Sequence, residues 1–513
     1  MIIFRNQSYT MKYTIFSSFI NSFYNSVNIS VIYDNIKILA LEGHEITYVY
    51  CDGKCFSKCR SNMTGNQQVC KYCKLYRNIF HRRLPHNIKF LPVSKFQDAI
   101  ERFDIPDFHS IQELKQIEYK NVKIGYAVIS SYLTLSRNLN PLFDETFIKY
   151  MDECLTLSQQ YTDVVRQIIV DTKPDVVACF NARHFETRPI IDSSIDLGIP
   201  HLSYEITFNE NSQPVKTTFH TTPHNVIENT QIINNLWDSD FLPTEEKIKI
   251  AQQFFFKRKN SIPSGDKLYV KDQKTGLLPD NFDKSKHNIL ILNSSEDEFA
   301  SLGEEFENNT FFPSQLDGIK YFIDKYKSLP DYHFFLRVHP NLKNVKYQYH
   351  TKLYELFNNI DNFTIIPADS PISTYAMIDN CNKVVVFGST TGPEAAYWGR
   401  PVILLSYCIY SLLDICYTPK TFEELDQLVL DKNLPKKDII GTLKYGYYRL
   451  NNEYESYTYF PYQIKRINFF DKHFDITLYP FNWLSKLYAV IIQMLGKRVL
   501  YTCYSYPQKE QIE

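Results

Sequence analysis

The chain has 513 residues, which is too long for one hydrophobic core and predicts two or three domains. Hydrophobic residues make up 44% and charged residues 22%, a composition typical of a globular protein rather than a disordered one. The 56 Lys and Arg residues nearly cancel the 57 Asp and Glu residues. The resulting formal net charge of -1 argues against a nucleic-acid partner, which would require a surplus of positive charge.

The first 27 residues are interrupted by Asn, Ser and Lys, so this stretch does not resemble a signal peptide. No apolar run in the sequence reaches the roughly 18 residues that a bilayer-spanning helix needs. We therefore expect a cytoplasmic protein.

In the first half of the chain, helical and strand patterns alternate, which is typical of parallel sheets with crossover helices. A helical pattern at 36–41 is followed by a turn at Gly43. The patterns beyond it predict strands at 46–50, 176–180 and 201–205, and helices at 145–170 and 187–197. We assign residues 1–260 to an N-terminal Rossmann-like domain.

Apolar periodicity is lost across 261–287, where turn residues dominate, and we expect an interdomain linker there. Residues 288–460 are expected to form a second Rossmann-like domain. Its predicted strands are 288–292, 334–336, 363–366, 384–387 and 402–405. The predicted fold class is therefore α/β, with two Rossmann-like domains that face each other across a cleft.

The last segment, 461–513, is predicted to be a helical tail that packs back on the body of the protein. Between 483 and 495, apolar residues recur on one helical face, with Lys497 and Arg498 close behind. The same face would also suit a helix lying on a membrane surface, so peripheral contact with the inner face of a membrane is an alternative.

Polar side chains follow several predicted strands of the second half. Because ligands bind beyond the carboxyl ends of the strands in open parallel sheets, these residues are candidates for one binding site. Glycines and hydroxyls between a strand and a helix let backbone N–H groups approach an anion such as phosphate. The candidates are Ser295, Glu296, Arg337, His339, Gly388, Ser389, Thr390, Thr391, Gly392 and Glu394.

Two of these candidates have distinct expected roles. His339 stands at a strand end before Pro340, and its ring could stabilise a departing phosphate, although a packed turn residue is the alternative. Glu394 falls in the first turn of the next helix, where its carboxylate could accept hydrogen bonds from ribose hydroxyls. Candidates for a general base lie at strand ends of the first half: Asp52, His184 and Glu205.

Cysteines cluster in an insert at 51–73. Cys70 and Cys73 have a spacing that suits a metal, and Cys55 with Cys59 could complete four thiolates around a structural zinc ion or an iron–sulfur cluster. Reduced thiols, or disulfides in an exported protein, are the alternatives.

Three runs of the second half, 336–341, 367–375 and 387–401, resemble bacterial capsule and surface-polysaccharide biosynthesis proteins. These are similar to glycosyltransferases of the two-Rossmann GT-B fold. In the first half, the turns at 50–53 and 180–183 resemble turns of the same family, although Ala182 stands where the family usually has Gly.

The resemblance implies a glycosyltransferase that moves a sugar from a nucleotide-sugar donor to a growing capsule or surface polysaccharide, or to a glycolipid. It implies that His339 contacts the donor phosphate, with Ser389 and Thr390 on the other side. Asn181 and Arg183 would lie on the acceptor side, and no metal would be required for catalysis. Two alternatives stay open: a sugar-nucleotide 2-epimerase of the same fold, and a non-catalytic GT-B scaffold in a polysaccharide assembly complex.

Overall fold

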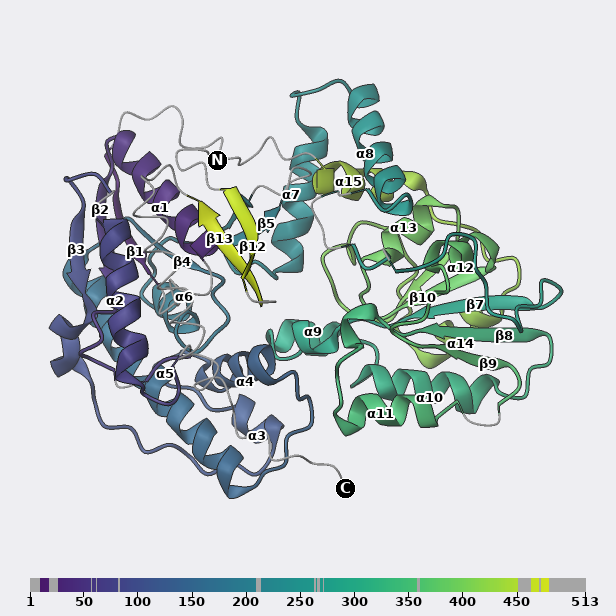
Figure 1. Cartoon of the computed structure of the whole chain (residues 1–513), viewed down its shortest axis with the longest axis horizontal. Helices are drawn as coiled ribbons and strands as arrows, with labels where there is room; N and C mark the ends of the chain where they lie inside the picture. The colour runs from purple at the N-terminus through teal and green to yellow at the C-terminus, as the bar shows by residue number, and fades with distance from the viewer. Residues whose placement is uncertain are drawn as a thin grey trace.

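The computed structural model has two α/β lobes, the first drawn in purple and blue and the second in green in Figure 1. The described residues are 10–17, 26–56, 58–60, 62–81, 84–208, 214–262, 264, 268–270, 272–357, 360–450, 463–469 and 472–478. Both lobes are built on a sheet of mostly parallel strands, so the predicted fold class is confirmed.

The first sheet has the strand order β3-β2-β1-β4-β5-β6, and every neighbouring pair is parallel except β5 and β6. Its strands are β1 (Lys12–Phe16), β2 (Glu45–Tyr50), β3 (Lys89–Pro92), β4 (Val176–Phe180), β5 (His201–Phe208) and β6 (Pro214–Phe219). The predicted strands at 46–50 and 176–180 are confirmed. Sequence patterns missed β1, a central strand that pairs with both β2 and β4, because Lys12 and Thr14 interrupt its apolar residues.

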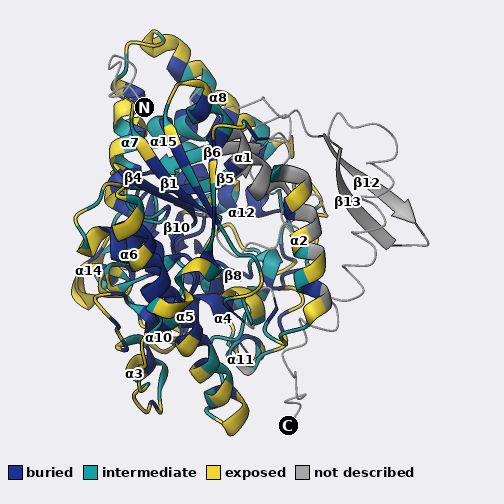
Figure 2. Cartoon of the chain, turned by 90° about the vertical axis from the view of Figure 1, so that its left-hand side faces the viewer, coloured by how far each residue is buried: buried dark blue, intermediate teal, exposed yellow. Residues whose placement is uncertain are grey.

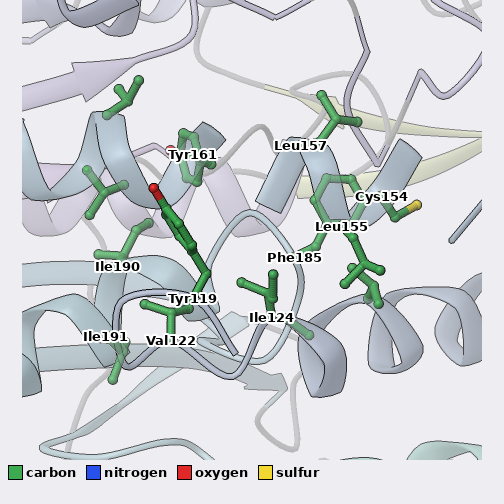
Figure 3. Close-up of a cluster of buried hydrophobic side chains, with 14 of the residues drawn as sticks. Tyr119, Val122, Ile124, Cys154, Leu155, Leu157, Tyr161, Phe185, Ile190 and Ile191 are labelled. Carbon is green, nitrogen blue, oxygen red and sulfur yellow. The ribbon is translucent and has the colours of Figure 1, made fainter. Parts of the chain in front are cut away.

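Helices cover both faces of this sheet: α1 (Ser26–Leu41), α2 (Gln67–His81), α3 (Ile111–Lys115), α4 (Ile124–Ser136), α5 (Glu145–Thr172) and α6 (Arg188–Asp196), with a 3₁₀ turn η1 at Val93–Ala99. The long helix α5 begins where the Asp144 carboxylate accepts a hydrogen bond from the Phe147 N–H. Its apolar face packs with α6 and the Tyr119–Ile124 segment into the main core of this lobe (Figure 3). Figure 2 shows this lobe from its outer side, with buried strands behind helices whose outer faces are exposed.

The second sheet is parallel throughout, with the order β11-β10-β7-β8-β9. Its strands are β7 (His287–Leu292), β8 (Tyr332–Arg337), β9 (Phe363–Ile366), β10 (Lys383–Val386) and β11 (Val402–Leu404), all at predicted positions. The accompanying helices are α9 (Glu304–Asn309), α10 (Gln315–Tyr326), α11 (Gln348–Glu355), α12 (Thr374–Asn380), α13 (Thr391–Tyr397) and α14 (Phe422–Leu430), with 3₁₀ turns η2 (Glu296–Glu298) and η3 (Pro340–Leu342). The strands β7, β8 and β10 are buried along their whole length, which explains why they read as continuous apolar runs.

Helices α7 (Val226–Asp238) and α8 (Thr244–Lys259) pack on the second lobe together with α15 (Ile439–Leu450), as Figure 1 shows. Phe255 of α8 stacks on Tyr397 of α13 with ring centroids 4.2 Å apart. The structural boundary between the lobes therefore falls before α7 rather than at residue 260. The segment 261–287 has no helix or strand in its described part, as its loss of periodicity predicts. It does not join the two lobes, however, because the helices α7 and α8 that precede it already pack in the second lobe.

The C-terminal segment differs from the predicted helical tail where it is described. Strands β12 (Gln463–Phe469) and β13 (Lys472–Leu478) pair antiparallel as a ribbon. The predicted helix at 483–495 lies outside the described residues. Within the described part of the chain, no helix combines the length and apolar character needed to cross a membrane.

Candidate functional site

A pocket lies at the carboxyl ends of β7, β8 and β10, as the strand-end argument predicts. It has about 550 Å³ of atom-free space, its open mouth included. The predicted site residues that line it are Arg337, His339, Ser389, Thr390, Thr391 and Glu394.

Arg337, at the end of β8, is a buried cation that forms no ion pair among the described residues, although the Asp369 carboxylate is near enough to favour its charged form. Its guanidinium donates to the carbonyl oxygens of Pro367 (2.7 Å) and Ser370 (3.2 Å), and its buried Nε has no hydrogen-bond partner in the described structure. Burial lowers the pKa of Arg337 to about 10, and the group still carries its charge at neutral pH. A buried positive charge of this kind is stabilised by an anion, so Arg337 makes the pocket suitable for a phosphate.

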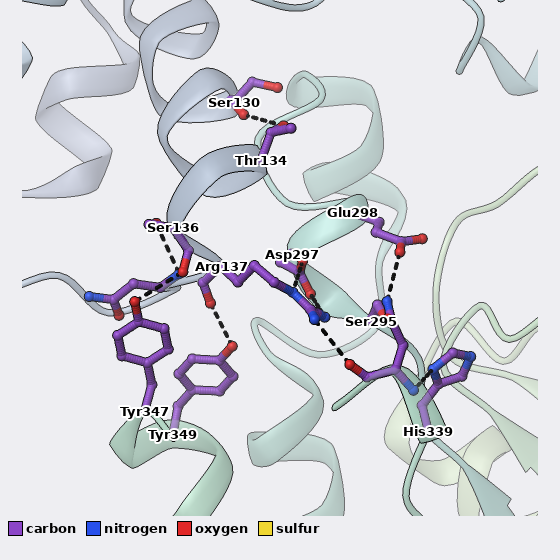
Figure 4. A network of polar contacts seen from close by, with 12 residues as sticks. Ser130, Thr134, Ser136, Arg137, Ser295, Asp297, Glu298, His339, Tyr347 and Tyr349 are labelled. Atoms are coloured by element: carbon purple, nitrogen blue, oxygen red, sulfur yellow. Dashed lines mark hydrogen bonds and ion pairs between the residues drawn. The ribbon is translucent and has the colours of Figure 1, made fainter. Parts of the chain in front are cut away.

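His339 lies two residues farther along and caps η3. Its backbone N–H donates to Asn293 Oδ1 (2.7 Å), and its Nδ1 accepts from the Asn341 N–H (3.2 Å), as Figure 4 shows for the second bond. With Nδ1 acting as an acceptor, the neutral ring carries its proton on Nε2. Burial, then the nearby Arg137, lowers the pKa of His339 to about 4, so the ring is neutral at physiological pH and offers an N–H donor.

The turn after β10 contributes hydroxyls rather than its glycines. Gly388 has a φ of +79°, a left-handed conformation that favours glycine, and a Cβ on Gly392 would lie 2.9 Å from the Tyr410 Oη. Neither glycine is among the lining residues, in contrast to the prediction, because each serves the local packing of the turn. Ser389, Thr390 and Thr391 line the pocket instead.

Glu394 lines the pocket, but its carboxylate is already engaged. Oε1 accepts from Arg258 Nε (3.1 Å) and Oε2 accepts from the Tyr375 hydroxyl. Both side chains of the ion pair are buried, at 9% exposure for Arg258 and 2% for Glu394. These contacts favour a structural role for Glu394, in which its carboxylate neutralises the buried Arg258, over the expected role in binding ribose hydroxyls.

Ser295 and Glu296 lie behind the pocket wall rather than on it. Ser295 Oγ accepts from Asn341 Nδ2 (2.9 Å), which supports the turn that carries His339. Glu296 Oε1 accepts from the Gln315 N–H (3.2 Å), and burial raises the pKa of its carboxyl to about 7.

Sequence reasoning missed several residues that line the pocket: Arg258, Tyr269, Gln273, Asn293 and Tyr375. Tyr269 and Gln273 lie in the segment interpreted as a linker, and the Tyr269 ring contacts the His339 ring edge-on at 4.9 Å. Tyr375 could have been found, because it belongs to the 367–375 run that carried the family resemblance. Asn293 directly follows the predicted strand 288–292 and so fits the strand-end pattern, whereas Arg258, Tyr269 and Gln273 follow no pattern that a single sequence shows.

The predicted acceptor-side residues gather at the end of β4 and β5. Asn181 Nδ2 donates to Glu205 Oε2 (2.5 Å), and burial raises the pKa of the Glu205 carboxyl. Arg183 donates to the carbonyl oxygen of Glu298 in the second lobe (2.9 Å) and to Thr134 Oγ1 (2.8 Å). The contact with Glu298 places this group at the face between the lobes.

The other two candidate bases are held within the first lobe. Asp52 accepts from Ser94 Oγ (2.7 Å), while its buried Oδ1 has no partner in the described structure. His184 is buried, and burial together with neighbouring cations holds its pKa well below the ordinary value, so its ring is neutral. Neither residue lines the pocket.

The cysteines of the insert are free thiols in the structure. Burial raises the pKa of Cys55 to about 11. Within the described residues, no group of three or more His, Cys, Asp or Glu side chains is placed to hold a metal ion. As placed, Cys55, Cys59, Cys70 and Cys73 do not form a ligand set, and a structural zinc or iron–sulfur cluster there stays a prediction.

Arg137, at the end of α4, connects the two lobes next to the pocket (Figure 4). It binds Asp297 in a bidentate manner, Nε to Oδ2 at 2.8 Å and NH2 to Oδ1 at 3.1 Å, and its NH1 donates to the Asn341 carbonyl oxygen (3.0 Å). Tyr349 donates in turn to the carbonyl oxygen of Arg137 (2.8 Å). The wall of the pocket is thus tied to the N-terminal lobe.

No protein-family model and no curated protein matches the chain. Among solved structures, the chain is similar to the beta Kdo 2,4 transferase of Thermosulfurimonas dismutans KpsC, with 13% identity over 52% of this chain and 78% of that one, at a TM-score of 0.35. The beta Kdo 2,7 transferase of the same organism's KpsC is 12% identical over 65% of this chain and 89% of that one, at a TM-score of 0.32. The UDP-GlcNAc 2-epimerase of Neisseria meningitidis, bound to UDP-GlcNAc, is 12% identical over 86% of this chain and 93% of that one, at 0.25. At these identities and scores, the likeness carries no argument about activity.

Proposed function

We propose that the protein is a glycosyltransferase that moves a sugar from a nucleotide-sugar donor, bound in the pocket of the second lobe, to a surface polysaccharide or glycolipid acceptor. The acceptor would approach from the first lobe, on the side of Asn181 and Arg183. The proposal rests mainly on the chemistry of the side chains that line the pocket.

The observation that carries the proposal is the buried Arg337, which forms no ion pair in the described structure and whose charge is only partly offset by the nearby Asp369 carboxylate. It lines the same pocket as His339 and the hydroxyls of Ser389, Thr390 and Thr391. A buried guanidinium, an imidazole N–H and hydroxyl donors together match the oxygens of a phosphate group.

In the proposed reaction, the anomeric carbon of the sugar is displaced from the nucleotide phosphate by an acceptor hydroxyl. Negative charge develops on the phosphate as it leaves, and Arg337 with the Nε2–H of His339 would stabilise that charge. His339 acts as a neutral hydrogen-bond donor in this step, because its pKa is lowered to about 4.

On the acceptor side, Glu205 is the carboxylate that we propose as the general base, because burial raises its pKa toward the range in which a base works best. Asn181 donates to one of its oxygens and would orient the group. Asp52 is the second candidate, since its Oδ1 has no partner among the described groups.

The test is a screen of nucleotide sugars, with mass spectrometry of the products in the presence and absence of an acceptor. Arg337→Gln should abolish donor binding, whereas Arg166→Gln, which removes an arginine paired with Asp196 at the surface, should leave donor binding unchanged. Conversion of a donor without any acceptor would instead identify an epimerase. The absence of nucleotide binding in a thermal-shift panel would favour the non-catalytic scaffold.

A further inference from the structure

The backbone N–H and carbonyl oxygen of Asn341, and its side-chain Nδ2, lie within a network that joins His339 to the opposite lobe. The Asn341 N–H donates to His339 Nδ1, and its Nδ2 donates to Ser295 Oγ (2.9 Å) and Glu298 Oε1 (3.1 Å). Its carbonyl oxygen accepts from Arg137 NH1 (3.0 Å). The orientation of the His339 ring therefore depends on a residue that is held from both lobes.

Arg137 is suited to hold this turn because three of its nitrogens are used at once. Two of them bind the carboxylate of Asp297, which is only 8% exposed, and the third reaches Asn341. Arg137 itself has a φ of +59°, the left-handed conformation at the end of α4 that directs the chain out of the helix. Figure 4 shows its side chain extending from α4 toward Asp297 and the turn beyond.

We infer that Arg137 is a positioning residue for the proposed glycosyl transfer: by holding Asn341 from the first lobe, it fixes the Nε2–H tautomer and the direction of the His339 ring. The inference rests on the proposed function of the pocket. It makes the orientation of His339 dependent on contact between the lobes, so that His339 contributes fully to stabilising the leaving group only when the two lobes are engaged.

The matched control is Lys115, which also forms an interlobe ion pair. Its Nζ lies 2.5 Å from Glu307 Oε1, and the pair joins α3 to α9. No hydrogen bond or ion pair recorded for Lys115 in the described structure reaches the turn that carries His339. Lys115→Ala thus weakens the contact between the lobes without touching the proposed positioning network.

The experiment records side-chain ¹H–¹⁵N correlations of histidine-labelled full-length protein, with the His339 signal assigned by its loss in His339→Gln. The unaltered protein should show mainly the neutral tautomer protonated at Nε2, with a measurable minor fraction protonated at Nδ1. In Arg137→Ala, the ratio of Nε2–H to Nδ1–H forms should fall about fivefold, the scale of one lost hydrogen bond. Lys115→Ala should leave the ratio unchanged.

Arg137→Lys provides a second variant that keeps the interface charge, in case Arg137→Ala does not fold. A lysine cannot bind Asp297 in a bidentate manner and reach Asn341 together, so the tautomer ratio should fall here too. A His339 signal that is unchanged in a folded Arg137 variant, or one that changes equally in Lys115→Ala, would overturn the inference. This readout needs no substrate, so it stands even if the screen for transferase activity fails.

With an active donor in hand, kcat of Arg137→Ala should fall roughly 10- to 100-fold, the cost of a displaced reacting group. The KM for the donor should stay within about threefold, because the His339 contact strengthens only as the phosphate leaves. A change in donor KM with kcat preserved would contradict a positioning role.

Discussion

Removal of the Glu394 carboxylate tests whether this residue stabilises the fold, as its ion pair indicates, or binds ribose hydroxyls, as its position in the sequence predicts. Glu394→Ala leaves the Arg258 guanidinium, only 9% exposed, without its ion-pair partner. At the 3.1 Å between Arg258 Nε and Glu394 Oε1, the attraction amounts to about 5 kcal/mol with an effective dielectric constant of ~20. Breaking one side of a buried pair costs about 3–5 kcal/mol, because the remaining charge is left uncompensated.

The assay is thermal unfolding of the variant beside the unaltered protein, followed by circular dichroism. A loss of that size corresponds to a drop in Tm of roughly 6–20 °C for a domain of this size. The double variant Arg258→Met/Glu394→Gln should recover most of the loss, because apolar packing can replace a buried ion pair at little cost. If Glu394→Ala shifts Tm no more than a surface substitution does, or if the double variant is worse than the single one, the reasoning is wrong.

Four further predictions address the pocket, pH, packing and the cysteines. His339→Ala should lower transferase turnover by about 10²- to 10³-fold with Tm nearly unchanged, and a folded, fully active variant would remove His339 from the mechanism. The pKa of Glu296 is raised from 4.5 to about 7 in the folded protein. Between these two pH values the Glu296 carboxyl keeps its proton in the folded protein and loses it in the unfolded chain. Stability should therefore fall as pH rises from about 4.5 toward 7, and Glu296→Gln should flatten this slope in Tm measured across the same window. Gly441→Ala would place a methyl carbon 1.9 Å from the Leu413 carbonyl oxygen, so α15 must shift. In chemical denaturation, the free energy of unfolding should fall by at least about 1–3 kcal/mol. An unchanged denaturation midpoint would mean that α15 shifts at no cost and would contradict this prediction. Elemental analysis of protein purified without chelator tests the insert at 51–73, where the metal prediction requires about one zinc or iron per chain.

The sequence by itself determined most of the sheet framework. Strands β7, β8 and β10 are buried along their whole length and each contains a short apolar run, and that signal is local. The rule that ligands bind at the carboxyl ends of parallel strands then brought Arg337 and His339 to one pocket, as the structure has them. These inferences need only neighbouring residues and a general rule of topology.

Only the tertiary structure decided what the polar groups of the pocket contact. Glu394 binds Arg258, which is 136 residues away in the sequence, and Arg137 binds Asp297, which is 160 residues away. No local sequence pattern can therefore predict either pair. The same holds for β1, whose five residues become a central strand only through pairing with β2 and β4. Periodicity reports which face of an element is buried, whereas the choice of partner depends on how distant elements pack. That is why the sequence identified the edge of the sheet where the site lies, and the fold alone decided which charges there are compensated and which are open to a ligand.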